Sequence, residues 1–265
     1  MQLPCDRSCK TRIRGNMTLS RSICIATAFA SLWFAVHAAT VRAQNISAAQ
    51  PKNDPPKTRA DSRNANCRII YLGIVGALEP PNNKHSGVVQ IRDTLSGPEY
   101  PDVCARSVSP YNWTQGLHWL LKHFPAHPVR LTDEELARIP KVILVGHSAG
   151  GWAVLGVARD LRRRNIPVEL MVQVDSVGVT DHTVPRNVKA AAIFHARDVM
   201  MPLTTKSLRL EDSTRTKIVA NVLVKGAGHW SITRDPRIRN LVIDDVDSLR
   251  TASASPDSSD SQSQP

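Results

Sequence analysis

The sequence predicts an α/β fold in which one mostly parallel sheet of about six strands carries helices on both faces. Short apolar runs rich in β-branched residues alternate with segments of helical periodicity over residues 67–247. One such run, residues 141–145, ends in a glycine-flanked turn around Ser148, and an apolar helical stripe follows at once. Because alternating strands and helices are joined by right-handed crossovers, these observations predict one domain built on a parallel sheet.

The expected elements follow in order along the chain. The strands are short apolar runs, as in a sheet buried on both faces; they span residues 68–75, 103–108, 141–145, 168–174, 190–195 and 219–224. The helices show apolar stripes; they span residues 86–95, 113–124, 152–161 and 235–246. Thr132 and Glu135 form a capping-box pattern for a further short helix. Pro125 stops the helix before it, and Asp235-Pro236 opens the last one as a cap followed by proline.

The N-terminal segment has the order of a secretory signal. Basic residues precede an apolar stretch at residues 23–39, and residues 41–43 offer a cleavage site before Gln44. We therefore expect a signal peptide at residues 1–43, with Met17 as an alternative start, and a secreted or periplasmic protein. An uncleaved membrane anchor is the alternative, although the stretch is short for a span of about 20 residues.

Two further segments are expected to lie outside the folded domain. Residues 44–66 are polar, contain several prolines and show no periodicity, which is typical of a flexible leader. Residues 248–265 are dominated by Ser, Asp, Gln and Pro, with Leu249 as the large apolar exception, and are expected to form a disordered tail.

The charge balance argues against a nucleic-acid partner. Of the formal charge of +11, residues 1–43 hold six Lys and Arg against one acidic residue, which leaves +6 for the rest. The densest remaining cluster, Arg159 with residues 162–164, falls at the end of a predicted helix, where cations suit the helix dipole. No aromatic residues alternate with it in the way that base stacking requires.

The cysteines indicate a disulfide and no metal centre. Cys67 and Cys104 remain after removal of the signal peptide, and an even count in an exported protein suggests a bridge. Two buried free thiols are the alternative. Zinc-ligand spacings and the glycine patterns that bind nucleotides are both missing from the sequence, so no metal and no cofactor are expected.

The turn around Ser148 carries the strongest chemical signal. Gly146-His147-Ser148-Ala149-Gly150 lies between a predicted buried strand and a predicted helix. Glycines two before and two after a serine allow a sharp turn that exposes the hydroxyl at a helix N-terminus, where developing negative charge is favoured. A capping serine in an ordinary turn is the alternative. This segment resembles the nucleophile turn of the α/β-hydrolase superfamily, in a minimal, lipase- or esterase-like form similar in economy to cutinases and without a large lid.

The resemblance implies a base and an acid. In this superfamily the histidine follows the last strand, which points to His229 after the glycine-containing loop at residues 225–228. A surface-loop histidine is the alternative; His147 is expected to pack, and His195 is a weaker rival. The acid is expected at Asp175, where the strand after the nucleophile helix ends, as in lipase-like relatives. Asp198, one strand later, is the alternative and occupies the commoner superfamily position.

Two backbone N–H groups should stabilise an oxyanion. One belongs to Ala149, directly after the nucleophile. The other is assigned to Ile74, in the expected loop at residues 73–76. The sequence thus predicts an exported serine hydrolase that cleaves small-molecule or lipid esters through a Ser-His-Asp triad and an acyl-enzyme, with transient contact to a membrane surface. A thioesterase or amidase with the same triad, or a non-catalytic binding protein of this fold, are the alternatives.

Overall fold

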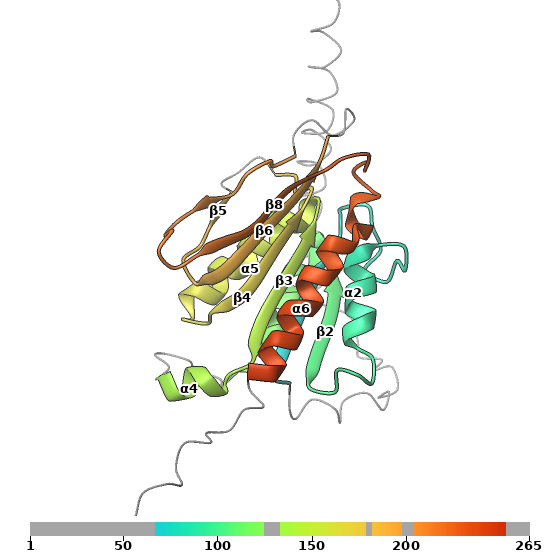
Figure 1. Cartoon of the computed structure of the whole chain (residues 1–265). Helices are drawn as coiled ribbons and strands as arrows, with labels where there is room; N and C mark the ends of the chain where they lie inside the picture. The colour runs from blue at the N-terminus through green and yellow to red at the C-terminus, as the bar shows by residue number, and fades with distance from the viewer. Residues whose placement is uncertain (1–66, 125–132, 179–181, 198–203, 253–265) are drawn as a thin grey trace, which may run out of the picture. The chain divides into compact units, whose positions relative to one another are not determined.

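A six-stranded, wholly parallel sheet forms the centre of the computed structural model, which describes residues 67–124, 133–178, 182–197 and 204–252. The strand order is β2-β1-β3-β4-β6-β8, and each adjacent pair is parallel. The strands are β1 (Ile69–Ile74), β2 (Val103–Val108), β3 (Lys141–His147), β4 (Val168–Val174), β6 (Val188–Ala196) and β8 (Lys217–Val224). The predicted α/β class, with helices on both faces of about six strands, is confirmed (Figure 1).

Helices cover both faces of this sheet. They are α2 (Gly87–Leu95), α3 (Trp113–Leu121), α4 (Asp133–Arg138), α5 (Ala149–Arg163) and α6 (Pro236–Ala252), with short 3-10 turns η2 (Pro110–Asn112) and η3 (Ile232–Arg234). The apolar residues of α3 and α5 pack in one core cluster, and those of α2 and α6 in another. In Figure 1, α2 and α6 lie in front of the sheet and α5 lies behind it.

The chain also forms a small second sheet that the sequence did not predict. Two-residue strands β5 (Thr183–Val184) and β7 (Arg209–Leu210) pair in parallel. Their shortness removes the periodicity on which strand prediction depends. Val184 and Leu210 of this sheet pack in the core cluster that contains α3 and α5.

The C-terminal boundary corrects the expected domain limit. The disordered tail was expected to begin at Ser248, but α6 continues to Ala252. Leu249 packs against the core cluster of α2 and α6. Arg250 donates a hydrogen bond from Nε to Oδ1 of Asp102 at 3.0 Å and lies over the ring of Tyr100. These contacts extend the helix beyond the point where composition alone turns polar.

A disulfide joins Cys67, just before β1, to Cys104 in β2, with 5.5 Å between the two Cα atoms. The two cysteines therefore form a disulfide and are not free thiols. The disulfide closes a loop with a sequence separation of 37 residues at the edge of the sheet where β1 and β2 begin. The strands that precede the site are tied together at their amino ends.

Several predictions fall outside the described residues: the signal peptide at 1–43, the leader at 44–66, the cap Thr132 and the alternative acid Asp198. Within the described part of the chain, no helix has the length and apolar character needed to cross a membrane.

Because all six strands run in parallel, their carboxyl ends meet at one edge of the sheet. The segments that follow Ile74, Val108, His147, Val174 and Val224 all start there.

Candidate active site

Ser148 occupies a strained turn between β3 and α5. Its backbone has φ 55° and ψ −123°, a region that a non-glycine residue rarely adopts. Its N–H donates to the carbonyl of Val174 at 3.0 Å, and its own carbonyl accepts from the N–H of Val177 at 3.0 Å. The turn is therefore held on both sides by the strand that follows the helix, and the serine is presented at the carboxyl edge of the sheet.

The two glycines of the motif are required by close packing. A Cβ atom at Gly146 would collide with the carbonyl group of Gly150, and one at Gly150 would collide with the carbonyl oxygen of Ile74. The start of α5 thus lies directly against the ends of β1 and β3. A side chain at either position would push the helix away and displace Ser148.

His229 lies in the loop between β8 and η3, and its ring reaches the serine. Nε2 of His229 is 2.9 Å from Oγ of Ser148. The imidazole is almost completely buried, with 1 % of its residue surface exposed. An imidazole in this position can accept the hydroxyl proton of the serine.

Asp175 follows β4 directly and completes the chain of hydrogen bonds. Its Oδ2 lies 2.7 Å from Nδ1 of His229, and its Oδ1 accepts from the N–H of Ala196 at 2.9 Å. The residue has φ 43° and is wholly buried. The structure thus brings Ser148, His229 and Asp175 together in one line. His195, the weaker rival base, lies in β6 outside this line, and burial lowers the pKa of its imidazole.

Two backbone segments at this edge of the sheet offer N–H groups, the start of α5 and the loop after β1. Ala149 is the first residue of α5, and its N–H has no partner among the described residues, as expected for a first helical turn. Ile74, the second predicted donor, is placed differently: it is the last residue of β1, in register with Val108 and Gly146, so it belongs to the sheet ladder and not to a loop.

The loop after β1 offers another donor. The N–H of Val75 donates to the carbonyl of Val108 at 3.1 Å, and the N–H of Gly76 donates to Oε2 of Glu79 at 2.8 Å. The next N–H, that of Ala77, has no hydrogen-bond partner within the described ranges. Ala77 is the second residue of a turn closed by the Glu79 N–H and the Gly76 carbonyl at 3.1 Å. Among the described residues, the Ala77 N–H is thus unoccupied, whereas Ile74 belongs to the sheet.

A second carboxylate–imidazole pair contacts the backbone of His229. The sequence did not predict this pair. Nδ1 of His147 is 2.7 Å from Oε2 of Glu79, and its Nε2 is 2.9 Å from the backbone carbonyl of His229. His147 was expected only to pack. The signal that could have found this pair is an acidic residue in the first loop combined with a histidine inside the serine motif.

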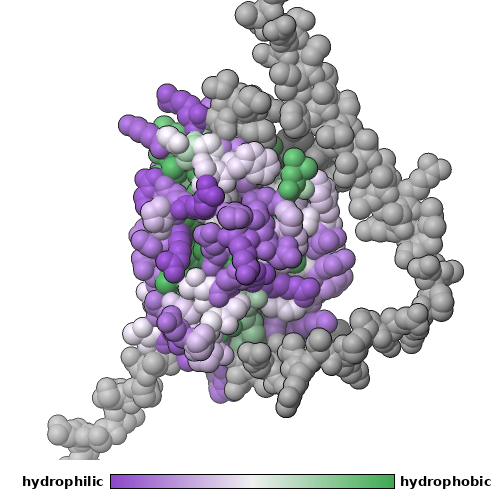
Figure 2. Space-filling view, turned by 90° about the vertical axis from the view of Figure 1, so that its right-hand side faces the viewer, coloured by the Kyte–Doolittle hydropathy of each residue, from purple (hydrophilic) through white to green (hydrophobic). Residues whose placement is uncertain are grey.

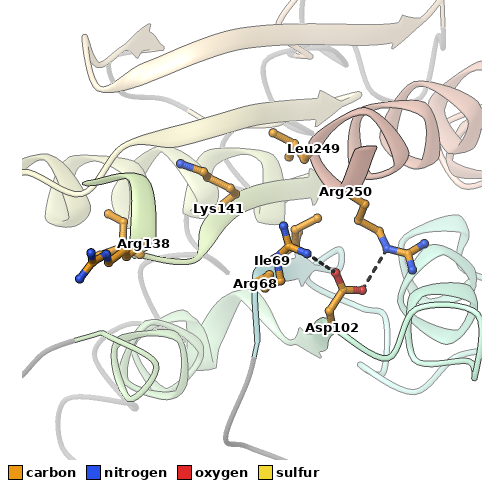
Figure 3. Close-up of a pocket in the computed structure, with 8 residues that line it drawn as sticks. Arg68, Ile69, Asp102, Arg138, Lys141, Leu249 and Arg250 are labelled. Carbon is orange, nitrogen blue, oxygen red and sulfur yellow. Dashed lines mark hydrogen bonds and ion pairs between the residues drawn. The ribbon is translucent and has the colours of Figure 1, made fainter. Parts of the chain in front are cut away.

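A surface cavity elsewhere in the domain is not part of this site. Figure 3 shows its lining side chains, which come from the amino-terminal ends of β1 and β3, from the end of α4, from the residues before β2 and from the end of α6. Ser148 lies at the opposite, carboxyl-terminal edge. Arg68 and Arg250 both pair with Asp102 there, and Arg138 pairs with Glu134.

Exposed apolar side chains mark the edge that carries Ser148. The face shown in Figure 2 is mostly hydrophilic, with apolar residues in small separate patches. Three large apolar residues with exposed side chains follow the carboxyl ends of β1, β2 and β8. They are Leu78, with 78 % of its surface exposed, Tyr111 with 42 % and Trp230 with 53 %. The ring of Trp230 lies 5.2 Å from that of His229. Exposed apolar side chains thus lie on the segments at this edge, and one of them, Trp230, lies beside His229.

The order of the parts defines the class of fold. A strained serine follows the third strand of a parallel sheet, an aspartate follows the fourth, and a histidine follows the last. This is the α/β-hydrolase fold, as the sequence motif predicted.

Comparisons with known proteins find solved structures that are similar to this chain, but they assign it to no family. No family model matches the sequence, and no curated protein matches it. Among solved structures, the chain is similar to Est1E from Butyrivibrio proteoclasticus, with 12 % identity, a TM-score of 0.40, and coverage of 69 % of this chain and 89 % of the other. It is similar to the hyperthermophilic esterase of Pyrobaculum calidifontis, with 14 % identity, a TM-score of 0.41, and coverage of 72 % and 77 %. It is also similar to the NocB thioesterase domain from the nocardicin cluster, with 12 % identity, a TM-score of 0.36, and coverage of 73 % of this chain and 97 % of the other. Likeness at this level says nothing of substrate.

Proposed function

We propose that the protein is a serine hydrolase that cleaves carboxylic esters, with Ser148, His229 and Asp175 as its triad. The observation that carries this proposal is the unbroken line of hydrogen bonds from Oγ of Ser148 through His229 to Asp175, at 2.9 Å and 2.7 Å. A serine hydroxyl is a weak nucleophile until a base takes its proton. A base held by a buried carboxylate has the tautomer and orientation that this step requires.

Acylation follows from the geometry. Oγ of Ser148 attacks the ester carbonyl while Nε2 of His229 takes its proton, and the charged imidazole is stabilised by Asp175. The carbonyl oxygen becomes an oxyanion that accepts hydrogen bonds from the N–H groups of Ala149 and Ala77. When the tetrahedral intermediate collapses, His229 gives the proton to the departing alcohol and the acyl group stays on the serine.

Deacylation uses the same groups in reverse. Water enters where the alcohol left, gives a proton to His229 and attacks the acyl carbon. The acid is released, and the proton returns to Oγ of Ser148.

The exposed apolar residues favour an ester with an apolar part. Leu78 and Trp230 flank the segments that carry Ala77 and His229, and Tyr111 follows the neighbouring strand β2. Apolar groups exposed beside a polar site are typical of ligand-binding or membrane-contacting surfaces. We infer that a lipid or aromatic ester suits this edge better than a small charged one, and that transient contact with a membrane surface brings the substrate to it.

We also propose that the protein is exported. The N-terminal segment has the order of a secretory signal, and a disulfide between Cys67 and Cys104 fits an oxidising compartment. Intact-mass measurement of the protein from a secreting host should give an N-terminus near Gln44. A membrane fraction that retains residues 1–43 would favour the anchor instead.

Turnover of p-nitrophenyl esters of graded chain length tests the activity. The account predicts hydrolysis by the wild type and loss of turnover, on the order of 10⁴- to 10⁶-fold, in Ser148→Ala. Ser109→Ala, which alters a serine after β2 at the same edge, is the matched control and should retain full activity. Parallel assays with thioester and amide analogues identify the leaving group. If folded wild type hydrolyses none of these, the chain is a non-catalytic protein of this fold.

A further inference from the structure

A buried carboxylate–imidazole pair, formed by Glu79 and His147, contacts the backbone of His229. His147 is wholly buried and Glu79 is 9 % exposed. One ring nitrogen of His147 contacts Glu79 and the other contacts the main chain of His229, at 2.7 Å and 2.9 Å. The triad makes no use of either side chain, so their burial at this point requires an explanation.

The partners of His147 define its protonation. A carbonyl oxygen only accepts, so Nε2 must carry the hydrogen that it shares with His229. Nδ1 faces an oxygen of Glu79 that already accepts the Gly76 N–H. Burial raises the pKa of the Glu79 carboxyl, but the hydrogen bond and charge of His147, together with the Gly76 N–H, lower it further, to below its usual range. The ring of His147 is thus held between a carboxylate oxygen and a main-chain carbonyl oxygen, one at each ring nitrogen.

This pair connects three segments that must keep fixed relative positions. Glu79 closes the turn that holds Ala77, through the Gly76 N–H and its own N–H. His147 is the residue before Ser148. Its other bond reaches the backbone of His229, and the two imidazole rings lie 4.9 Å apart. The ring of His147 thus contacts Glu79, which closes the turn that contains Ala77, and the backbone of His229, while the chain continues from His147 directly into Ser148.

We propose that Glu79 and His147 are positioning residues that hold the His229 loop and the Ala77 turn at the distances needed for catalysis. The inference rests on the proposed function, because it assigns the pair a role in that reaction. A misplacement of about 1 Å at a reacting group can cost on the order of 100-fold in rate. A pair that only fills the core would affect stability and leave turnover unchanged.

The substitution Glu79→Gln separates these readings because it keeps the shape of the side chain. A single oxygen of Glu79 accepts from both Gly76 and His147. If the amide oxygen takes that place, neutral His147 keeps its hydrogen on Nδ1 and loses the bond to His229. If the amide nitrogen takes it, the bond to Gly76 is lost. One of the three bonds therefore fails in either orientation.

The matched control is Glu169→Gln. Glu169 is also buried and also contacts a basic side chain, that of Lys189, at 2.9 Å. It lies near the amino end of β4, away from Ser148. Both substitutions remove a buried carboxylate that contacts a basic side chain, and only one of the two pairs touches the site.

Steady-state kinetics and NMR test the proposal together. We expect kcat for an active ester to fall about 10- to 100-fold in Glu79→Gln with KM nearly unchanged, while Glu169→Gln keeps the wild-type kcat. In the wild type, the Nε2–H of His147 should give a slowly exchanging proton signal, because it is buried and bonded to the His229 carbonyl. Wild-type kcat in folded Glu79→Gln, or a rapidly exchanging Nε2–H of His147 in the wild type, would overturn the proposal. If the wild type itself is inactive, the proposed function fails, whereas the NMR result still reports on the contact between His147 and His229.

Discussion

Oδ2 of Asp175 lies 2.7 Å from Nδ1 of His229, and both residues are buried. The contact joins the end of β4 to the loop after β8 across the intervening strand β6. Asp175 reaches it with a positive φ of 43°, while its N–H donates to the carbonyl of Phe194 at 2.6 Å. The backbone of the neighbouring strand thus holds the carboxylate in a conformation that is otherwise unfavourable.

Asp175→Asn should lower kcat by about 10⁴-fold, because an amide stabilises neither the charged imidazole nor its working tautomer. Asp198→Asn is the matched control and should cost far less. Ester turnover, with folding checked by circular dichroism, decides between them. An inactive Asp198 variant beside a nearly active Asp175 variant would show that the acid has been misassigned.

Ala77→Pro should lower kcat/KM by about 10²- to 10³-fold, because proline removes the N–H that we assign to the oxyanion. Ala77 is the second residue of the turn from Gly76 to Glu79, a position that proline favours, so the backbone should tolerate the change. Asn82→Ala, at an exposed position of the same loop, keeps every backbone N–H and should retain the wild-type kcat/KM. A fully active Ala77 variant would place the donor elsewhere.

Replacing Cys67 and Cys104 by serine should lower the free energy of unfolding by about 3–4 kcal/mol, because the bridge closes a loop with a sequence separation of 37 residues. Urea denaturation measures this difference. In the unmodified protein, both cysteines should resist alkylation until a reductant is added. Rapid alkylation of the untreated, folded protein would show that the thiols are free.

Asp245→Asn should stabilise the protein at neutral pH. Burial raises the pKa of this carboxyl to about 6, with a further contribution from the charge of Glu169. Its Oδ2 is buried without a hydrogen-bond partner among the described residues. Because the folded-state pKa lies above the unfolded value, the charged group destabilises the fold increasingly as pH rises to about 6, and fully above it.

The expected gain from Asp245→Asn is about 1 kcal/mol at pH 7.5, since the group is partly exposed. Thermal unfolding at several pH values measures it. The gain should vanish near pH 4, where the wild-type carboxyl is protonated in the folded state. An equal effect at both pH values would indicate a cause other than ionisation.

The parts of the site that could be predicted from sequence are those with a local pattern. Ser148 lies in a five-residue motif between a strand and a helix. Asp175 directly follows an apolar strand, and His229 follows the glycine-containing loop after another. Because the strands are parallel, their carboxyl ends lie at one edge of the sheet. These features depend on chain order and on strand direction, both of which can be read from the sequence.

The oxyanion donor and the supporting pair depend on information that no local pattern carries. A backbone N–H has no side-chain signature, and the choice between Ile74 and Ala77 depends on which N–H groups the sheet and Glu79 already occupy. Glu79 and His147 are 68 residues apart in sequence and meet only in the folded domain. The polar composition after Ser248 likewise gave no sign that Leu249 and Arg250 anchor the end of α6.

Labelling with a fluorophosphonate probe, followed by peptide mass spectrometry, tests the central claim most directly. The probe reacts with a serine only when a base and an oxyanion site activate it, so it does not require the natural substrate. We predict one phosphonate adduct on the peptide that contains Ser148, abolished in Ser148→Ala and strongly slowed in Asp175→Asn. A folded wild-type protein that remains unlabelled, or that carries the adduct on another serine, would contradict the assignment of Ser148 as the nucleophile of a serine hydrolase.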